Sequence, residues 1–197
     1  MSVKHNKSRE RNADSTRAAL LGVARKLFAS RGYPDVSVDE IVQAARVTKG
    51  ALYHHFKDKL EVFRAVVVEI EEEIRKRLQK AAARPGDGMA QLRAACHEYL
   101  DACILDEVGR VVVLDSPAAL GWSDRCRLNL EYEVGFFVER LRVVRGEDPA
   151  LEPTAQMLVG ALNVAGRVIA QAENRRAARA QVGETIDRLI VAVSGKS

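Results

Sequence analysis

The sequence is poor in the residues that mark several common classes of protein. Its three cysteines, Cys96, Cys103 and Cys126, are odd in number and form no Cys-x-x-Cys pair, which argues against a disulfide framework or a zinc site. No apolar run approaches the roughly 18 residues that a membrane span needs, and the polar start of the chain does not resemble a signal peptide. We therefore expect a cytoplasmic protein with no membrane partner and with reduced, mostly buried thiols; a redox switch is the less favoured alternative.

Catalytic motifs are missing as well. No serine lies in a nucleophile-elbow setting, and there is no glycine-rich phosphate loop and no histidine pair with metal-ligand spacing. His54 and His55 are adjacent, so on a helix they point about 100° apart and cannot easily share one metal ion. We expect no catalytic residue, no metal and no cofactor, and so a protein that is not an enzyme.

No alternating strand pattern and no repeat of fixed period occurs, whereas apolar residues recur at helical spacing along most of the chain. The sequence therefore predicts an all-α protein with about nine helices. Besides a short helix pair within residues 37–59, helices are expected at about 15–31, 58–83, 89–106, 108–114, 123–145, 153–173 and 176–194. The charged residues Glu71, Glu72, Glu73, Arg75, Lys76 and Arg77 are expected on a solvated face of helix 58–83.

Positive charge is concentrated in the N-terminal third. Residues 1–60 contain 12 Lys and Arg against 6 Asp and Glu, whereas residues 61–197 contain 19 against 21. The N-terminal third is thus suited to meet a polyanion, although a merely soluble basic surface is an alternative explanation. The polar residues 1–13 are expected to form a mobile arm, which either is a disordered tail or contacts phosphate or the minor groove.

Residues 37–59 predict two short helices joined by a tight turn. Ser37 is placed to cap the first, with Glu40 at capping-box spacing, and Thr48 is placed to cap the second. The outward side of the second helix presents a compact polar tip formed by Lys49, Gly50, Tyr53 and His54. A helix pair of this size, with a small basic second helix, is what entering the major groove of DNA requires.

The presence of Gly50 requires an explanation, because glycine inside a helix lowers the stability of that helix. Close approach of the backbone to another molecule is one explanation, and a packing constraint is the other.

Several motifs of the N-terminal third occur together. They are Thr16-Arg17, Ala24-x-x-Leu27-Phe28-x-x-x-Gly32-Tyr33, Ser37-Val38-x-x-Ile41 and Ala44-x-x-Val47-x-Lys49-Gly50-Ala51-Leu52-Tyr53-His54-His55-Phe56-x-x-Lys59. Over about residues 14–74 this pattern resembles the TetR family of transcriptional regulators. The resemblance implies a three-helix helix-turn-helix DNA-binding domain at residues 14–60 and a helical ligand-binding and dimerisation domain at residues 61–197.

The resemblance also implies where DNA is contacted. The expected residues are Ser37, Thr48, Lys49, Gly50, Tyr53, His54 and Lys59. Lys49 and Gly50 match the tip of the recognition helix, where family members touch base edges. Tyr53 and His54 match positions that contact phosphate and sometimes bases. Ser37, at the N-terminus of the second helix, and Lys59, at the start of the fourth, match phosphate contacts, and Thr48 belongs to the polar tip of the third helix. These roles agree with the chemistry of lysine, of tyrosine hydroxyls and of helix N-termini.

The resemblance further implies a homodimer joined by the last two long helices, about 154–173 and 176–194. Apolar stripes agree with this: Leu158, Leu162, Ala165 and Ile169 beside Gly160, Ala161 and Gly166, and then Val182, Ile186, Leu189, Ile190 and Val193. The alternative is that both stripes face their own monomer's core. A two-fold dimer would match a near-palindromic operator in double-stranded DNA.

An unknown small-molecule effector is expected among the helices between residues 58 and 173. Candidate lining residues are Phe63, Tyr99, Cys103, Arg110, Leu120, Trp122, Cys126, Asn129, Phe137 and Asn163. Most of them would be core in any all-α protein, but Arg110, Asn129 and Asn163 would need polar partners inside a helical bundle. If Arg110 faces the pocket, an anionic or carbonyl-bearing ligand is favoured.

The sequence therefore predicts a ligand-responsive DNA-binding regulator, with repression as the favoured direction. Effector binding would spread the two DNA-binding heads beyond the operator spacing, and the long helix beginning at Asp58 would be the hinge. An effector-independent activator or architectural protein, and a helical interaction protein that no longer binds DNA, are the alternatives.

Overall fold

The computed structural model describes the backbone of residues 2–195 and the side chains of residues 14–195. The segments are α1 (Ser2–Arg31), α2 (Val38–Ala45), α3 (Lys49–His55), α4 (Lys59–Ala82), α5 (Gly88–Ala102), η1 (Glu107–Asp115), α6 (Ser116–Leu120), α7 (Trp122–Asn129), η2 (Leu130–Val134), α8 (Gly135–Arg145), α9 (Leu151–Gln171) and α10 (Arg175–Val193). The π-helical η1 runs into α6, and the π-helical η2 joins α7 to α8. The described residues thus form nine continuous helices and no strand, which confirms the all-α prediction.

Two helix starts differ from the prediction. Helix α1 begins at Ser2 rather than near Ser15. Neither proline nor glycine occurs before Gly22, so no strong helix breaker separates the start of the chain from the predicted helix. The side chains of the expected arm, residues 1–13, and any contact they make with DNA, lie outside the described residues. Helix α9 begins at Leu151, two residues before Pro153, because proline is tolerated in a first turn, where amides lack helical partners anyway.

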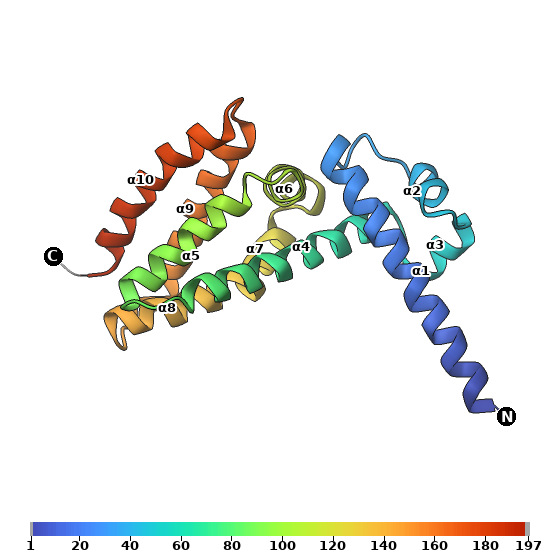
Figure 1. Ribbon diagram of the computed structural model, residues 1–197, viewed down its shortest axis with the longest axis horizontal. Helices are drawn as coiled ribbons and strands as arrows, with labels where there is room; N and C mark the ends of the chain where they lie inside the picture. The colour runs from blue at the N-terminus through green and yellow to red at the C-terminus, as the bar shows by residue number, and fades with distance from the viewer. Residues whose placement is uncertain (1, 196–197) are drawn as a thin grey trace.

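Helix α4 links the N-terminal head, formed by α1, α2 and α3, to the body formed by the later helices (Figure 1). Its first turns complete the core of the head. The ring of Phe63 lies edge-on to Phe28, with centroids 5.2 Å apart, and 4.5 Å from the ring of Tyr33. Phe63 therefore belongs to the head's core, although it lies beyond the expected domain boundary at residue 60.

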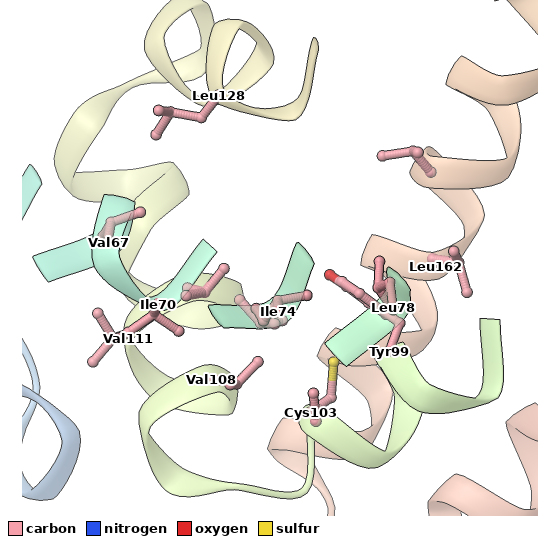
Figure 2. Close-up of a cluster of buried hydrophobic side chains, with 14 of the residues drawn as sticks. Val67, Ile70, Ile74, Leu78, Tyr99, Cys103, Val108, Val111, Leu128 and Leu162 are labelled. Carbon is pink, nitrogen blue, oxygen red and sulfur yellow. The ribbon is translucent and has the colours of Figure 1, made fainter. Parts of the chain in front are cut away.

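The later turns of α4 lie in the core of the body. Ile70, Ile74 and Leu78 are buried there with Tyr99 of α5 and Leu162 of α9, and Figure 2 shows these side chains gathered around the helix. These residues lie three or four positions apart, so α4 buries one apolar face along its length. Its outward face is not wholly solvated, however, and the exception is Glu71.

Glu71 forms a buried charge cluster with Arg125 of α7 and Glu133 of η2. The three residues are 1%, 5% and 2% exposed, so the prediction of a solvated Glu71 is wrong. Arg125 Nη1 donates a hydrogen bond to Glu71, and Arg125 Nη2 lies 3.7 Å from Glu133 Oε1. Burial and the neighbouring charge of Glu71 raise the pKa of Glu133 to about 8.

Substituting Arg125 by methionine should destabilise the protein strongly. The variant would leave the Glu71 carboxylate buried without its cation, and breaking a buried pair in this way typically costs about 3–5 kcal/mol. Urea denaturation would measure the loss. Arg127→Met on the same helix is the matched control, because Arg127 is exposed and should change stability by less than about 0.5 kcal/mol. Equal stabilities for the two variants would contradict a structural role for the cluster.

Candidate nucleic-acid interface and body cavity

The capping box of α2 is formed as predicted. Ser37 Oγ accepts a hydrogen bond from the Glu40 amide at 3.2 Å, and the Ser37 amide donates to Glu40 Oε2 at 2.8 Å. Arg31 of α1 pairs with the other oxygen of Glu40 at 2.5 Å. The guanidinium of Arg31 and the Ser37 bonds lower the pKa of Glu40 to about 2. The start of α2 is thereby tied to the end of α1.

The turn between α2 and α3 is a left-handed helix cap. Arg46 has φ 56°, and it is the one non-glycine residue of the described chain with positive φ. The Arg46 amide donates to the Gln43 carbonyl at 3.1 Å and the Val47 amide to the Val42 carbonyl at 3.0 Å. This pair of bonds is the Schellman motif, usually built with glycine at the left-handed position. It sets the direction in which α3 leaves α2.

Helix α3 buries one side and exposes the predicted polar tip. Thr48 Oγ1 accepts from the Ala51 amide at 3.1 Å, which confirms Thr48 as the N-cap. Leu52 and Phe56 are buried, as predicted. The residues on the outer side, Lys49, Gly50, Tyr53 and His54, are all exposed.

Nothing within the head requires glycine at position 50. A Cβ built there would have Thr48 Oγ1, at 3.8 Å, as its one neighbour within 4 Å, which is ordinary contact. The packing explanation for Gly50 therefore has no support in the structure. The open backbone at the tip of α3 leaves room for another molecule to approach closely.

The two lysines expected to contact DNA are both engaged within the protein. Lys49 Nζ lies 2.7 Å from Asp39 Oδ1 of α2, and this carboxylate raises the pKa of Lys49. Lys59 Nζ donates to the carbonyls of Tyr33 and Val36, both at 2.8 Å, and lies 4.2 Å from the centre of the Tyr33 ring. Lys59 thus clamps the loop after α1 onto the start of α4. These two bonds leave one N–H of the ammonium for another acceptor.

Two adjoining cavities lie beside α7 and α9 of the body, with volumes of about 280 and 160 Å³. Both are lined by Trp122, Asn129 and Gly160. The larger is completed by Cys126, Leu130, Val134, Gln156 and Val159, and the smaller by Val112, Val113, Pro117, Arg125, Asn163, Val164 and Arg167. Four of the residues predicted to line an effector pocket therefore lie around these two cavities: Trp122, Cys126, Asn129 and Asn163.

The other expected lining residues lie outside these two cavities. Phe63 and Phe137 are buried in apolar packing, and Tyr99 and Cys103 are buried beside Gly166. Arg110 lies at the junction of head and body, where its Nη1 donates to the Arg31 carbonyl at 3.3 Å. Burial raises the pKa of the Cys103 and Cys96 thiols, and all three cysteines are free.

Among the cavity residues that sequence analysis missed, Arg125 is the one that is both charged and buried. An arginine in an amphipathic helix pattern is ordinarily assigned to the solvated face, and no local signal sets Arg125 apart from Arg127 two residues later. Within the described part of the chain, no helix combines the length and apolar character needed to cross a bilayer, and no group of His, Cys, Asp and Glu side chains is arranged to hold a metal ion.

A short helix with an exposed polar tip, set by a tight turn and joined to a larger helical body, defines a helix-turn-helix DNA-binding protein. Residues 20–66 match the bacterial regulatory proteins of the tetR family, and residues 89–193 match the Tetracyclin repressor-like C-terminal domain. The chain therefore belongs to the TetR family of transcriptional regulators. Members of this family bind DNA and usually dimerise.

Individual relatives agree with this assignment. A TetR-family transcriptional regulator from Pectobacterium atrosepticum is 34% identical, with a TM-score of 0.79 over 94% of this chain and 97% of that one. The Transposon Tn10 TetC protein of Escherichia coli is 31% identical over 68% of this chain and 67% of its own length. The transcriptional regulator AcrR of Shigella flexneri is 35% identical over 53% of this chain. The matched region covers 49% of AcrR, about half of its length.

Replacing Arg46 by glycine should stabilise the head. The left-handed conformation costs an L-residue roughly 1–2 kcal/mol, and the greater freedom of unfolded glycine offsets part of the gain, so an increase of up to about 1 kcal/mol is expected. Arg46→Ala removes the side chain beyond the Cβ, and it should not increase the stability of the protein. Thermal unfolding of both variants measures the difference, and equal shifts in Tm would contradict backbone strain at this turn.

Proposed function

We propose that this protein is a homodimeric repressor that binds a near-palindromic operator through α3 and leaves it when a small-molecule effector enters the body. The observation that carries the proposal is the exposed tip of α3. There a glycine that the head does not require lies beside Lys49, Tyr53 and His54, on a helix whose direction is set by two caps and a hydrogen-bonded turn.

Each residue of the tip has a role that its chemistry supports. Gly50 lets the helix backbone approach the base edges, and Lys49 exchanges Asp39 for a phosphate or a guanine acceptor. The Tyr53 hydroxyl and the His54 ring contact the phosphate backbone. Phosphates also meet the N-terminus of α2, after Ser37, and the remaining N–H of the Lys59 ammonium.

The dimer interface we propose is the outer face of α9 with the exposed part of α10. Most of the stripes expected to form it are instead buried in the monomer's own core, namely Leu158, Leu162, Ala165, Ile169, Ile186 and Ile190. The other expected residues, Val182, Leu189 and Val193, are partly buried against that core. The outer face of α9 carries a second stripe, formed by Met157, Gly160, Val164 and Val168 at intervals of three or four residues, and Val191 of α10 is exposed as well. Exposed apolar residues aligned along a helix are typical of association surfaces.

A route from the cavity to the head supports effector control. Val112, Val113 and Pro117 line the smaller cavity and flank Asp115 along the chain. Asp115 Oδ2 accepts a hydrogen bond from the Tyr33 amide, immediately after α1, at 2.8 Å. A ligand that displaces the end of η1 would therefore move the contact that positions α1. The ligand would release the repressor from its operator if it binds this displaced form more tightly than the form that binds DNA.

Substituting Gly50 by alanine should separate folding from DNA binding. A helical alanine is more stable than glycine by up to about 1 kcal/mol, yet its methyl group would keep α3 from closing on the DNA. Fluorescence anisotropy with DNA from upstream of the gene should show at least about tenfold weaker binding, with Lys49→Ala and Tyr53→Phe also weakened. Gly22→Ala, at an open site of α1, is the matched control and should keep full affinity.

Salt dependence completes this test. Wild-type binding should be sequence-selective and should weaken steeply as salt concentration rises, because phosphate contacts release counterions. Wild-type affinity that Gly50→Ala and Lys49→Ala both leave unchanged would contradict the assignment of α3. A cavity that no compound occupies in a thermal-shift screen would favour an effector-independent activator instead.

Placing a charge on α9 should break the dimer. Val164→Glu introduces a carboxylate into the proposed apolar interface, and sedimentation should show monomer where the wild type is a dimer. Val143→Glu on α8 is the control, because Val143 is 59% exposed and Val164 is 61% exposed, so both substitutions should spare the monomer's fold. An unchanged dimer in Val164→Glu would locate the interface elsewhere.

A further inference from the structure

The wall of the cavities beside α7 and α9 is exposed to solvent on one side. Trp122, at the start of α7, lines both cavities and is 80% exposed. Leu130, which lines the larger cavity, is 51% exposed. Tryptophan has a large apolar surface, and it is one of the residues most enriched at the centres of protein interfaces. An exposed tryptophan at the edge of an apolar cavity therefore points to another molecule that covers it.

The same wall continues into the outer face of α9. Gly160 lines both cavities, and Val164 lines the smaller one. Both are exposed members of the stripe that we propose as the dimer interface. A Cβ built at Gly160 would have no neighbour within 4 Å, so packing inside the monomer does not require glycine there. Any molecule that packs on the outer face of α9 therefore also borders the two cavities.

A stable dimer needs more surface than this stripe offers. Specific interfaces bury about 800 Å² on each partner and involve about 20–30 residues a side. The outer face of α9 and Val191 of α10 contribute only a few apolar side chains. The interface must therefore extend beyond them, and on the side of α7 it meets Trp122 and Leu130. A second copy of the chain is the occupant that these observations support, because members of the family usually dimerise.

We propose that the partner subunit covers Trp122 and closes the two cavities, so that the effector site is complete only in the dimer. The inference rests on the proposed function, because it assumes a dimer interface on the outer face of α9. Small-molecule sites typically bury about 70–90% of the surface of their ligand. With Trp122 and Leu130 exposed, a single subunit leaves one side of the ligand in water, and the partner covers that side. Effector binding and dimerisation are then linked, and each strengthens the other.

The larger cavity also defines the kind of ligand. None of the residues that line it carries a charge, and its polar side chains are the thiol of Cys126 and the amides of Asn129 and Gln156. Burying an unpaired charge against such a wall is strongly unfavourable. The volume of about 280 Å³ is roughly twice the volume of about 150 Å³ that accommodates benzene. The site therefore suits an uncharged, largely apolar molecule about the size of two fused rings.

The fluorescence of Trp122, the one tryptophan of the chain, tests whether the partner covers it. Val168→Glu places a charge in the stripe of α9 at a residue that lines neither cavity, and it should give a monomer. Acrylamide should quench Trp122 at least about threefold more efficiently in this monomer than in the wild-type dimer, because the core of an interface excludes solvent. Val143→Glu is the control, which should remain dimeric and be quenched like the wild type.

Substituting Trp122 by glutamate tests the same contact from the other side. Trp122 lies in the first turn of α7, where a carboxylate is favourable for the helix, so the variant should fold. Its dimer should be at least about tenfold weaker in sedimentation, a loss typical of an aromatic side chain at the centre of an interface. Val143→Glu, which also replaces an exposed apolar residue by glutamate, should dimerise like the wild type.

Two probes of one shape test the ligand class. 2-Naphthamide and 2-naphthoate share a fused ring pair and differ in charge. Calorimetric titration at pH 7 should show that the wild-type dimer binds 2-naphthamide with a Kd of about 1 mM or below. The Val168→Glu monomer should bind it at least about tenfold more weakly, since the partner's side of the site is missing. 2-Naphthoate should bind the dimer more weakly than 2-naphthamide does.

The outcomes separate this inference from the proposed function. Equal quenching of Trp122 in the wild type and in Val168→Glu, or an unchanged dimer in Trp122→Glu, would overturn coverage by the partner. Equal binding of 2-naphthamide by dimer and monomer, no binding of it, or tighter binding of 2-naphthoate would overturn the shared site for an uncharged ligand. A dimer that still binds its operator in anisotropy would leave the regulator proposal standing in each case. A wild-type protein that sediments as a monomer would remove both.

Discussion

One apolar face of α4 carries a single hydrophobic core from the head into the body, and the rest of the structure depends on this constraint. Phe63 packs against aromatic rings of the head, and two to four turns later Ile70, Ile74 and Leu78 lie in the core of the body. Protein cores are densely packed and have few alternative arrangements. The head therefore cannot tilt as an independent unit, and any reorientation of α3 must involve α4 or the contacts that flank it.

Polar contacts around α4 connect the head to the body at several points. Arg25 of α1 binds Glu73 of α4 at 2.5 Å and Glu107 of η1 at 2.8 Å, so one guanidinium joins three segments. Asp115, at the other end of η1, receives the Tyr33 amide. Since η1 also forms part of the cavity wall, it is the segment through which an occupied cavity and the orientation of the head are coupled in the function we propose.

The charged residues show where reasoning from sequence stops. Helical periodicity defines which residues of α4 share a face, but it does not say which neighbouring helices cover that face. Glu71 follows the exposed pattern of its neighbours and is nevertheless buried, because Arg125, 54 residues later, supplies a compensating charge. The same limitation explains the stripe of α9 assigned to the dimer interface: Leu158 and Leu162 are apolar at the right spacing for either partner, and the monomer's own core covers them.

The sequence by itself determined the local features of this protein. Helix caps, the turn of the helix pair and the exposed tip of α3 depend on residues within a few positions of one another, and they agree with the all-α prediction and with membership of the TetR family. Only the tertiary structure decided that Arg125 is buried and which face of α9 remains exposed. It also decided that the Lys59 ammonium binds carbonyls of the loop after α1. These outcomes depend on contacts between residues distant in sequence, because burial and electrostatic compensation are properties of the packed chain rather than of any one helix.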